Sequence, residues 1–145
     1  MSTRAMVGYS KPDGTWLAVW NHWSGETQQL GRWIIREMKR RSGDFAAFCS
    51  RYVDGCPEGW SSLAEGKRCE EPVGFLFGEF DGIVARCHES RNPLCYDSHY
   101  LYLLHPPKRR LYVFEVKDEV MRPFGMITFD EQGTPTPRAL PKVEE

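Results

Sequence analysis

Three pairs of short β-forming runs, each pair separated by a turn signal, constrain the fold of this 145-residue chain more than any other feature. The strongest turn signal is Asp81-Gly82, because an Asp-Gly pair accepts the positive φ angles of a tight hairpin turn. Pro12 and Gly14 punctuate the first turn, and Pro-Pro-Lys-Arg forms the third. We therefore expect three antiparallel hairpins, formed by residues 5–9 with 16–21, 73–80 with 83–88, and 100–105 with 110–116.

Two helices are predicted between the first and second hairpins. Ser24 is placed to act as the N-cap of the first helix, which ends in a run of cations before Gly43. Asp44 is placed to cap the second helix, which ends at Gly55. Apolar residues recur at helical spacing in both segments: Leu30, Trp33, Ile34 and Met38 in the first, and Phe45, Phe48, Cys49, Tyr52 and Val53 in the second.

Together these elements predict an α+β fold, in which an antiparallel sheet of about six or seven strands, built from hairpins, carries the two main helices on one face. Both faces of residues 16–21 are apolar, which is typical of a central strand that is covered on both sides. A last strand is expected over residues 125–129.

The rest of the chain is expected to connect or to trail from this sheet. Residues 55–72 are rich in Gly, Pro, Glu and Ser and are interpreted as a connector with one helical turn near residues 61–65. Residues 134–145 are rich in proline and are expected to form a disordered tail. We expect residues 1–133 to form a single globular domain.

Composition and charge narrow the possible function classes. Apolar residues make up 41% of the chain and charged residues 27%, as in ordinary globular domains. The 19 basic residues nearly balance the 20 acidic ones, so a nucleic-acid partner is not expected. Since neither a signal peptide nor a run of ~18 apolar residues is present, we expect no membrane association and a cytoplasmic location. The five cysteines are expected to be free thiols.

The segment Asn21-His22-Trp23-Ser24-Gly25 is the first candidate site, because it joins a predicted strand to a predicted helix. Unpaired backbone N–H groups at the helix start and the His22 imidazole could bind a small anion or a carbonyl group there. The candidate ligand-binding residues are Arg4, Asn21, His22 and Ser24. In the alternative interpretation, Asn21 and His22 hydrogen-bond the turn while the tryptophans fill the core.

Thiols and imidazoles gather in a second candidate site, formed by Cys87, His88, Cys95 and His99. Zinc takes such ligands, but the cysteine spacing does not match the Cys-x2-4-Cys knuckle of common structural sites. We therefore expect no metal and no cofactor, and keep zinc as the alternative.

Aromatic and basic residues form a third candidate site, which is a protein interface. Trp60 lies in the polar connector, where no strand or helix pattern requires an indole, so we expect it to be an exposed anchor. The other interface residues are Tyr100, Tyr102, Tyr112, Arg109 and Arg110. In the alternative, the tyrosine rings are buried against a helix and only their hydroxyls reach the rim.

The N-terminal region resembles a group of small uncharacterised proteins of phages and bacteria. The resemblance is carried by Thr3-Arg4, Gly8-Tyr9, Asp13-Gly14, Asn21-His22-Trp23-Ser24-Gly25 and Leu30-Gly31. It departs where the group has a His-Trp-Asp-Gly-Tyr-Pro motif, since Ser24 replaces the aspartate and Glu26-Thr27 replaces Tyr-Pro. The resemblance implies a phage or mobile-element protein acting in the bacterial cytosol.

No coherent catalytic set is present, because the sequence contains neither a Gly-x-Ser-x-Gly elbow nor a glycine-rich phosphate loop. The leading hypothesis is therefore a non-enzymatic, phage-encoded protein that binds and modulates a host bacterial protein, for example a defence or housekeeping complex. The alternative is an enzyme or small-ligand-binding protein with its site at His22. The sequence does not specify an oligomeric state.

Overall fold

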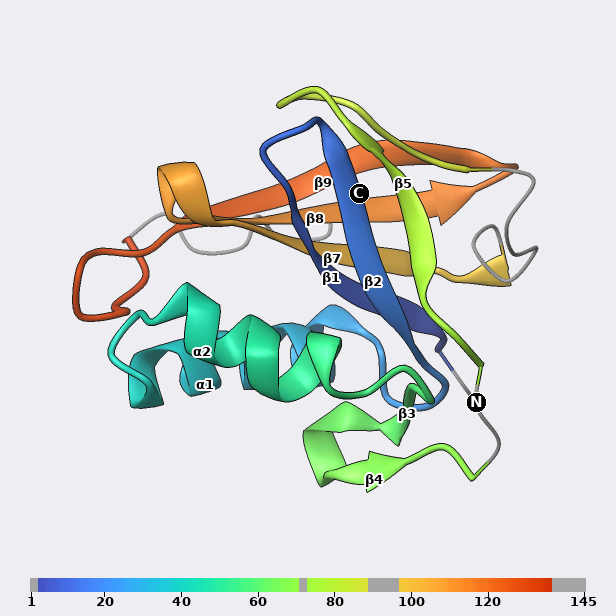
Figure 1. The fold of residues 1–145 in the computed structure, drawn as a ribbon, viewed down its shortest axis with the longest axis horizontal. Helices are drawn as coiled ribbons and strands as arrows, with labels where there is room; N and C mark the ends of the chain where they lie inside the picture. The colour runs from blue at the N-terminus through green and yellow to red at the C-terminus, as the bar shows by residue number, and fades with distance from the viewer. Residues whose placement is uncertain (1–2, 71–72, 89–96, 137–145) are drawn as a thin grey trace.

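The computed structural model describes residues 3–70, 73–88 and 97–136, and all nine strands in these ranges belong to one mixed sheet (Figure 1). The strand order is β4-β3-β2-β1-β7-β8-β9, and β5 pairs with both β2 and β6. The strands are β1 (Ala5–Ser10), β2 (Thr15–Asn21), β3 (Trp60–Ser62), β4 (Lys67–Arg68), β5 (Leu76–Phe80), β6 (Ala85–Cys87), β7 (Tyr100–His105), β8 (Arg110–Lys117) and β9 (Val120–Thr128).

The hairpin of β1 and β2 lies at the centre of the sheet. Its antiparallel register runs from Ala5 opposite Asn21 to Ser10 opposite Trp16, which confirms the first predicted hairpin. The two strands approach closely at Gly8, where a Cβ atom would lie 2.0 Å from the Leu17 carbonyl oxygen. Any larger residue at this position would therefore push the central strands apart.

The other two predicted hairpins are also present, as β5 with β6 and β7 with β8. The predicted α+β fold with two helices is confirmed, but the predicted antiparallel sheet of about six or seven strands fits only in part: the sheet has nine strands in the described residues and is mixed, because β7 pairs with β1 in parallel and β3 pairs with β2 in parallel. Turn residues reveal only the strand pairs that are adjacent in sequence, whereas these two pairs join segments far apart in the chain. The last strand also begins earlier than expected, at Val120.

The segment interpreted as a connector contributes structure of its own. Trp60–Ser62 forms β3 and Lys67–Arg68 forms β4. Between them lies the expected helical turn, which is the 3-10 helix η3 (Leu63–Glu65). The connector therefore extends the sheet beyond the end of β2.

The helices lie on one face of the sheet, below it in Figure 1. Asp44 caps the second helix as predicted, because its Oδ1 accepts a hydrogen bond from the Ala47 amide at 3.0 Å. Ser24 does not cap the first helix: it has a left-handed φ of 60°, and the cap position is Glu26. The helical segments on this face are η1 (Thr27–Gly31), α1 (Arg32–Arg40), α2 (Phe45–Cys49) and η2 (Ser50–Asp54), and a short 3-10 helix, η5 (Pro106–Lys108), forms the turn between β7 and β8.

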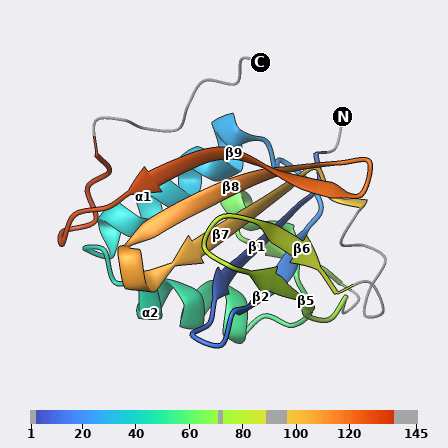
Figure 2. The same cartoon turned by 90° about the horizontal axis from the view of Figure 1, so that it is seen from above.

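A second core fills the opposite face of the sheet, which the β5–β6 hairpin covers (Figures 1 and 2). Trp16 is fully buried there, and its ring lies so close to Gly78 that a Cβ at Gly78 would clash with it. The Phe80 ring on β5 packs against two rings of β8: its centroid lies 5.0 Å from that of Tyr112 and 6.0 Å from that of Phe114. The sheet therefore curls around this core.

Past the last strand, residues 134–136 remain attached to the domain. The Thr136 amide donates to the Thr128 carbonyl at 2.9 Å, and Lys39 Nζ donates to Thr134 Oγ1 at 2.6 Å. Residues 137–145 of the predicted tail lie outside the described residues.

A buried ionic network ties the two helical segments together. The Glu37 side chain is 7% exposed, and its Oε2 accepts hydrogen bonds from Arg41 Nε at 2.8 Å and from the Tyr52 hydroxyl at 2.6 Å. Burial raises the pKa of Glu37, but these hydrogen bonds and the charges of Arg40 and Arg41 outweigh burial, so the net pKa is lowered.

We expect Glu37→Gln to lower the free energy of unfolding at pH 7 by about 2 kcal/mol, because hydrogen bonds to the carboxylate lose their charge. Because the pKa of Glu37 is lower in the folded state than in the unfolded chain, its ionisation stabilises the fold at pH values above the ordinary glutamate pKa. This contribution to the free energy of unfolding is lost as the pH falls through the folded-state pKa. Urea denaturation at pH 7, 5 and 3.5 should therefore show a difference from wild type that shrinks with acid. A difference that stays constant over this range would contradict the account; the exposed Glu131→Gln change serves as control.

Candidate functional site

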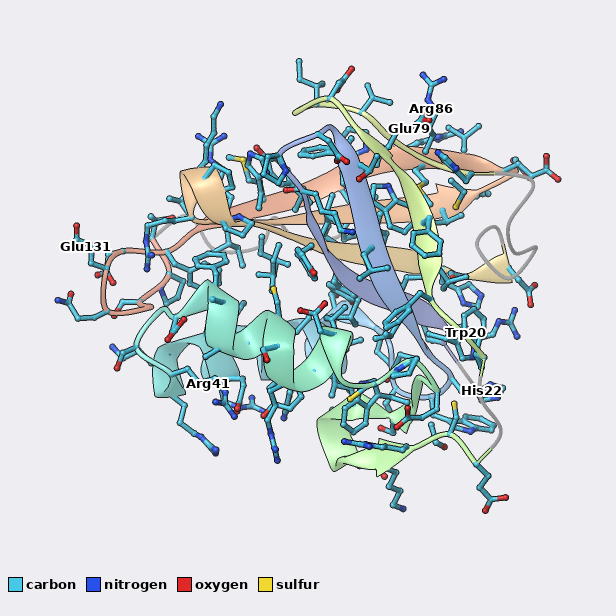
Figure 3. All side chains as sticks on the ribbon, in the orientation of Figure 1. Trp20, His22, Arg41, Glu79, Arg86 and Glu131 are labelled. Carbon is cyan, nitrogen blue, oxygen red and sulfur yellow. The ribbon has the colours of Figure 1, made fainter. Side chains whose placement is uncertain are left out.

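A groove of about 600 Å³ opens where β2 ends, between the Trp23 indole and strand β4. Trp20 and His22 lie at this end of the molecule, beside the β3–β4 hairpin (Figure 3). Aromatic, basic and acidic side chains all line the groove, so both apolar and polar contacts are available to a ligand. The lining residues are Trp20, His22, Trp23, Ser61, Lys67, Arg68, Cys69, Glu70 and Val73.

Backbone hydrogen bonds fix the corner that carries Trp23. The His22 amide donates to the Trp60 carbonyl at 3.0 Å, and the Trp23 amide donates to the Ser61 carbonyl at 2.8 Å. The chain then turns through Ser24, and the Gly25 amide donates to the Thr3 carbonyl at 2.9 Å. The corner is thus held on both sides, by β3 and by the residue before Arg4.

Asn21 is a structural residue at this corner. It is fully buried; its Nδ2 donates to the Trp23 carbonyl at 2.8 Å, and its Oδ1 accepts from the Leu63 amide at 2.7 Å. Both ends of the amide are therefore used to join the corner to the β3–η3 segment. This geometry matches the alternative interpretation, in which Asn21 hydrogen-bonds the turn.

The indole of Trp23 projects outward from the corner and is 48% exposed. The His22 ring contacts it edge-on, with centroids 4.6 Å apart and an interplanar angle of 61°. Trp20, on the other side of His22, is buried. The result is an aromatic ridge whose outer member faces solvent.

Arg4 does not join His22. Its Nε donates to the Asp97 carbonyl at 2.9 Å, and its guanidinium lies 3.7 Å from the Asp97 carboxylate. Neither Arg4, Asn21 nor Ser24 lines the groove. The structure therefore does not assemble the predicted four-residue ligand site, and only His22 of that set faces the groove.

The expectation that Trp60 is an exposed anchor is wrong. Trp60 is 6% exposed, and its Nε1 donates to the Tyr52 carbonyl at 3.0 Å. Its ring packs near the Tyr52 ring, with centroids 6.1 Å apart, and the Arg68 guanidinium lies over it, with the guanidinium carbon 5.4 Å from the ring centroid. The indole was missed as a core residue because strand β3 gives no periodic signal over three residues.

Two further residues of the predicted interface also have structural roles. Tyr102 is fully buried, and its hydroxyl donates to the Gly25 carbonyl at 2.6 Å, so this hydrogen bond fixes the end of the corner to β7. Arg109 donates to the carbonyls of Phe129, Gly43 and Asp130 and lies over the Phe45 ring. Both side chains are used within the fold.

The remaining members of the predicted interface are partly exposed: Tyr100, Tyr112 and Arg110. Arg110 Nη1 donates to the Tyr112 hydroxyl at 3.1 Å. Neither of these two residues lines the Trp23 groove. The structure thus does not bring the six predicted interface residues onto one surface with that groove.

The zinc hypothesis finds no assembled ligand set in the described residues. Cys87 is disulfide-bonded, which also corrects the expectation of free thiols at this position. The two histidines of the set have different partners: His88 Nε2 lies 3.0 Å from Glu79 Oε2, and His99 Nδ1 accepts a hydrogen bond from the Arg4 amide at 3.1 Å. Cys95 lies outside the described residues.

Among the described residues that line the groove, no nucleophile is activated. Burial, followed by the negative charge of Glu58, raises the pKa of Cys69, so its sulfur remains a thiol at neutral pH. The His22 side chain makes no hydrogen bond within the described part of the chain that would orient it as a general base. The arrangement can stack, pack and form ion pairs, which is the chemistry of binding.

Comparisons with protein-family models, with curated proteins and with solved structures find no match to this chain. Among the described helices, none has both the length and the apolar character needed to cross a membrane.

The two tryptophans at the corner should differ sharply in their contribution to stability. We expect Trp60→Ala to lower the free energy of unfolding by about 3–5 kcal/mol, because it empties a core position. Trp23→Ala should cost less than about 1 kcal/mol, because its amide hydrogen bond is kept and half of its ring is already in water. Chemical denaturation of both variants measures the difference; equal losses would contradict the assignment.

Proposed function

We propose that this chain is a non-enzymatic protein that binds another protein, and that the Trp23 groove is its recognition surface. The observation that supports this most strongly is a half-exposed indole on a corner that backbone hydrogen bonds hold in place. Tryptophan is among the residues most enriched at the energetic centre of protein interfaces. The groove beside it provides space for a partner side chain.

Preorganisation strengthens this proposal. Binding usually costs free energy when side chains and loops become ordered in the interface. The Trp23 backbone is already tied to Ser61, and His22 packs against the indole ring, so less ordering is required on binding. When a partner covers an exposed aromatic side chain that is already in position, little of the free energy gained by burying its surface is lost to ordering the side chain.

The rim of the groove is polar. The Lys67 side chain is 69% exposed, and its Nζ lies 3.5 Å from Glu65 Oε1. Arg68 Nη1 lies 2.9 Å from Glu58 Oε2. Exposed ion pairs of this kind contribute little to folding stability but can rearrange to meet charges on a partner. An aromatic centre with a charged rim is the usual anatomy of a non-obligate protein interface.

The resemblance of the N-terminal region to phage and bacterial proteins suggests which partner to look for. We propose a phage-encoded protein that acts in the bacterial cytosol, where it binds and modulates a host protein. The small-ligand or enzymatic alternative at His22 has less support, because the other three residues of that predicted site do not line the groove.

Affinity purification from host lysate tests the proposal, with the tagged wild type compared with Trp23→Ala. Ile83→Ala is the matched control, because Ile83 is a large apolar residue that is 72% exposed but lies on the β5–β6 turn. We expect one partner to be retained by wild type and by Ile83→Ala. Its affinity for Trp23→Ala should be about 30-fold weaker, which corresponds to about 2 kcal/mol for a central interface tryptophan.

Biolayer interferometry with the purified partner gives the affinities of all three proteins. The proposal fails if Trp23→Ala binds as tightly as wild type, or if Ile83→Ala is the variant that loses binding. Circular dichroism of each variant confirms that a loss of binding does not arise from unfolding.

A further inference from the structure

Strand β9 forms one edge of the sheet, because within the described residues β8 is its only strand partner (Figure 2). An edge strand presents backbone N–H and C=O groups that no neighbouring strand uses, and such an edge can accept a further strand. β9 is nine residues long, and its Met126 side chain is 41% exposed. The edge of β9 is therefore a surface on which an extended segment can dock.

Neighbouring residues of an antiparallel strand direct their backbone groups to opposite sides, and β9 follows this alternation. The Phe129 amide, just past the strand, donates to the Arg109 carbonyl on the β8 side at 2.8 Å. The Thr128 carbonyl accepts from the Thr136 amide on the outer side at 2.9 Å. Met126, two residues before Thr128, therefore also directs its N–H and C=O outward. Neither group has a hydrogen-bond partner within the described residues.

The chain begins to pair with this edge after it turns back past β9. Phe129 and Pro135 form an antiparallel bridge. Two hydrogen bonds flank the bridge: that of Thr136, and one from the Asp130 amide to the Thr134 carbonyl at 2.9 Å. At Thr136 the chain therefore runs antiparallel to β9, along its outer edge.

Side chains hold this turn in place. Asp130 Oδ1 accepts hydrogen bonds from the amides of Gln132 and Thr134, each at 2.9 Å. The Arg109 guanidinium donates to the Asp130 carbonyl, and Lys39 Nζ donates to Thr134 Oγ1 at 2.6 Å. The turn is thus attached to α1 and to the residue before β8, so the direction in which the chain leaves it is fixed.

The prolines that follow have a spacing that matches this direction. They alternate with other residues, at Pro135, Pro137 and Pro141. All three share the phase of Pro135, in which the backbone nitrogen faces away from β9. The positions whose amides would donate to β9 hold Thr136, Arg138 and Leu140. Proline is tolerated in a strand where its missing N–H is not needed, so a segment that composition alone predicts to be disordered has the pattern of an edge strand.

A proline of β9 limits how much of the edge is available. Pro123 lies opposite Phe114, which is two residues from Tyr112, the residue opposite Met126. Pro123 and Met126 therefore direct their backbones to the same outer side. The missing N–H of Pro123 removes a donor there without breaking the pairing with β8. The open part of the edge is thus the half of β9 that the chain already approaches.

We propose that residues 137–140, which lie outside the described residues, continue along the outer edge of β9 as a further antiparallel strand. In this register the Arg138 amide donates to the Met126 carbonyl, and the Met126 amide donates to the Arg138 carbonyl. Residues that lie opposite each other share one face of the sheet, so the aliphatic part of Arg138 covers the exposed Met126 side chain.

The docked segment would protect the sheet against pairing with another chain. Because prolines occupy most of the positions that face away from β9, the new edge offers few N–H donors. The docking uses no residue of the Trp23 groove, so it stands or fails separately from the proposed function.

Amide hydrogen exchange of the ¹⁵N-labelled full chain, followed by NMR, tests the proposal at the N–H of Met126. We expect Arg138→Pro to speed exchange of this amide about tenfold, the factor that corresponds to losing one or two backbone hydrogen bonds. Ala139→Pro is the matched control: it places the same ring one residue later, where the amide faces away from β9, and should leave the rate unchanged. Arg138→Ala keeps the backbone amide and should also keep the protection.

Three results would overturn the proposal. The first is a Met126 amide that exchanges in the wild type at the rate of an unprotected amide, and the second is the same Met126 rate in Arg138→Pro and Ala139→Pro. The third is protection that rises with protein concentration, which would assign the edge to a second copy of the chain. The Ile127 amide, which faces β8, should stay protected in every variant, so unfolding is recognised in the same spectra.

Discussion

The burial of the β1–β2 hairpin on both faces and along both edges is the constraint on which the rest of the structure depends. One face of the hairpin contributes Val7 and Val19 to the core beneath the helices, and the other contributes Met6 and Trp16 to the core beneath the β5–β6 hairpin. Its edges pair with β7 on one side and with β3 and β5 on the other. A strand pair that is covered in all directions leaves no free edge at the centre of the fold.

The corner after β2 follows from this arrangement. Once β2 leaves the sheet at Asn21, the chain must reverse within a few residues to place η1 against the core, and β3 supplies the carbonyls that the corner amides require. Trp23 lies past the last alternating position of the strand, so its indole is directed away from both cores. The same pairing that buries Trp60 therefore exposes Trp23.

Local signals in the sequence predicted what depends on neighbouring residues. The three hairpins and the Asp44 cap are confirmed, because turn glycines and capping oxygens act over a few residues. The parallel pairs of β1 with β7 and of β2 with β3 carry no such signal, since they form by burial between distant segments. Because no sequence signal marks β3, Trp60 was expected to be exposed, whereas in the structure Trp60 is buried and Trp23 is exposed. The Ser24-Gly25 pair after Trp23 could have indicated a turn instead of a helix start.

Photo-crosslinking from position 23 tests the central claim most directly, which is that the outward indole of Trp23 contacts a protein partner. Trp23 is replaced by a photoreactive phenylalanine, and the same residue is placed at Ile83 as the comparison, since both side chains are exposed but lie on different elements. The account predicts one covalent adduct with a host protein from position 23 and none from position 83. An adduct from position 83 alone, or none from position 23, would contradict it.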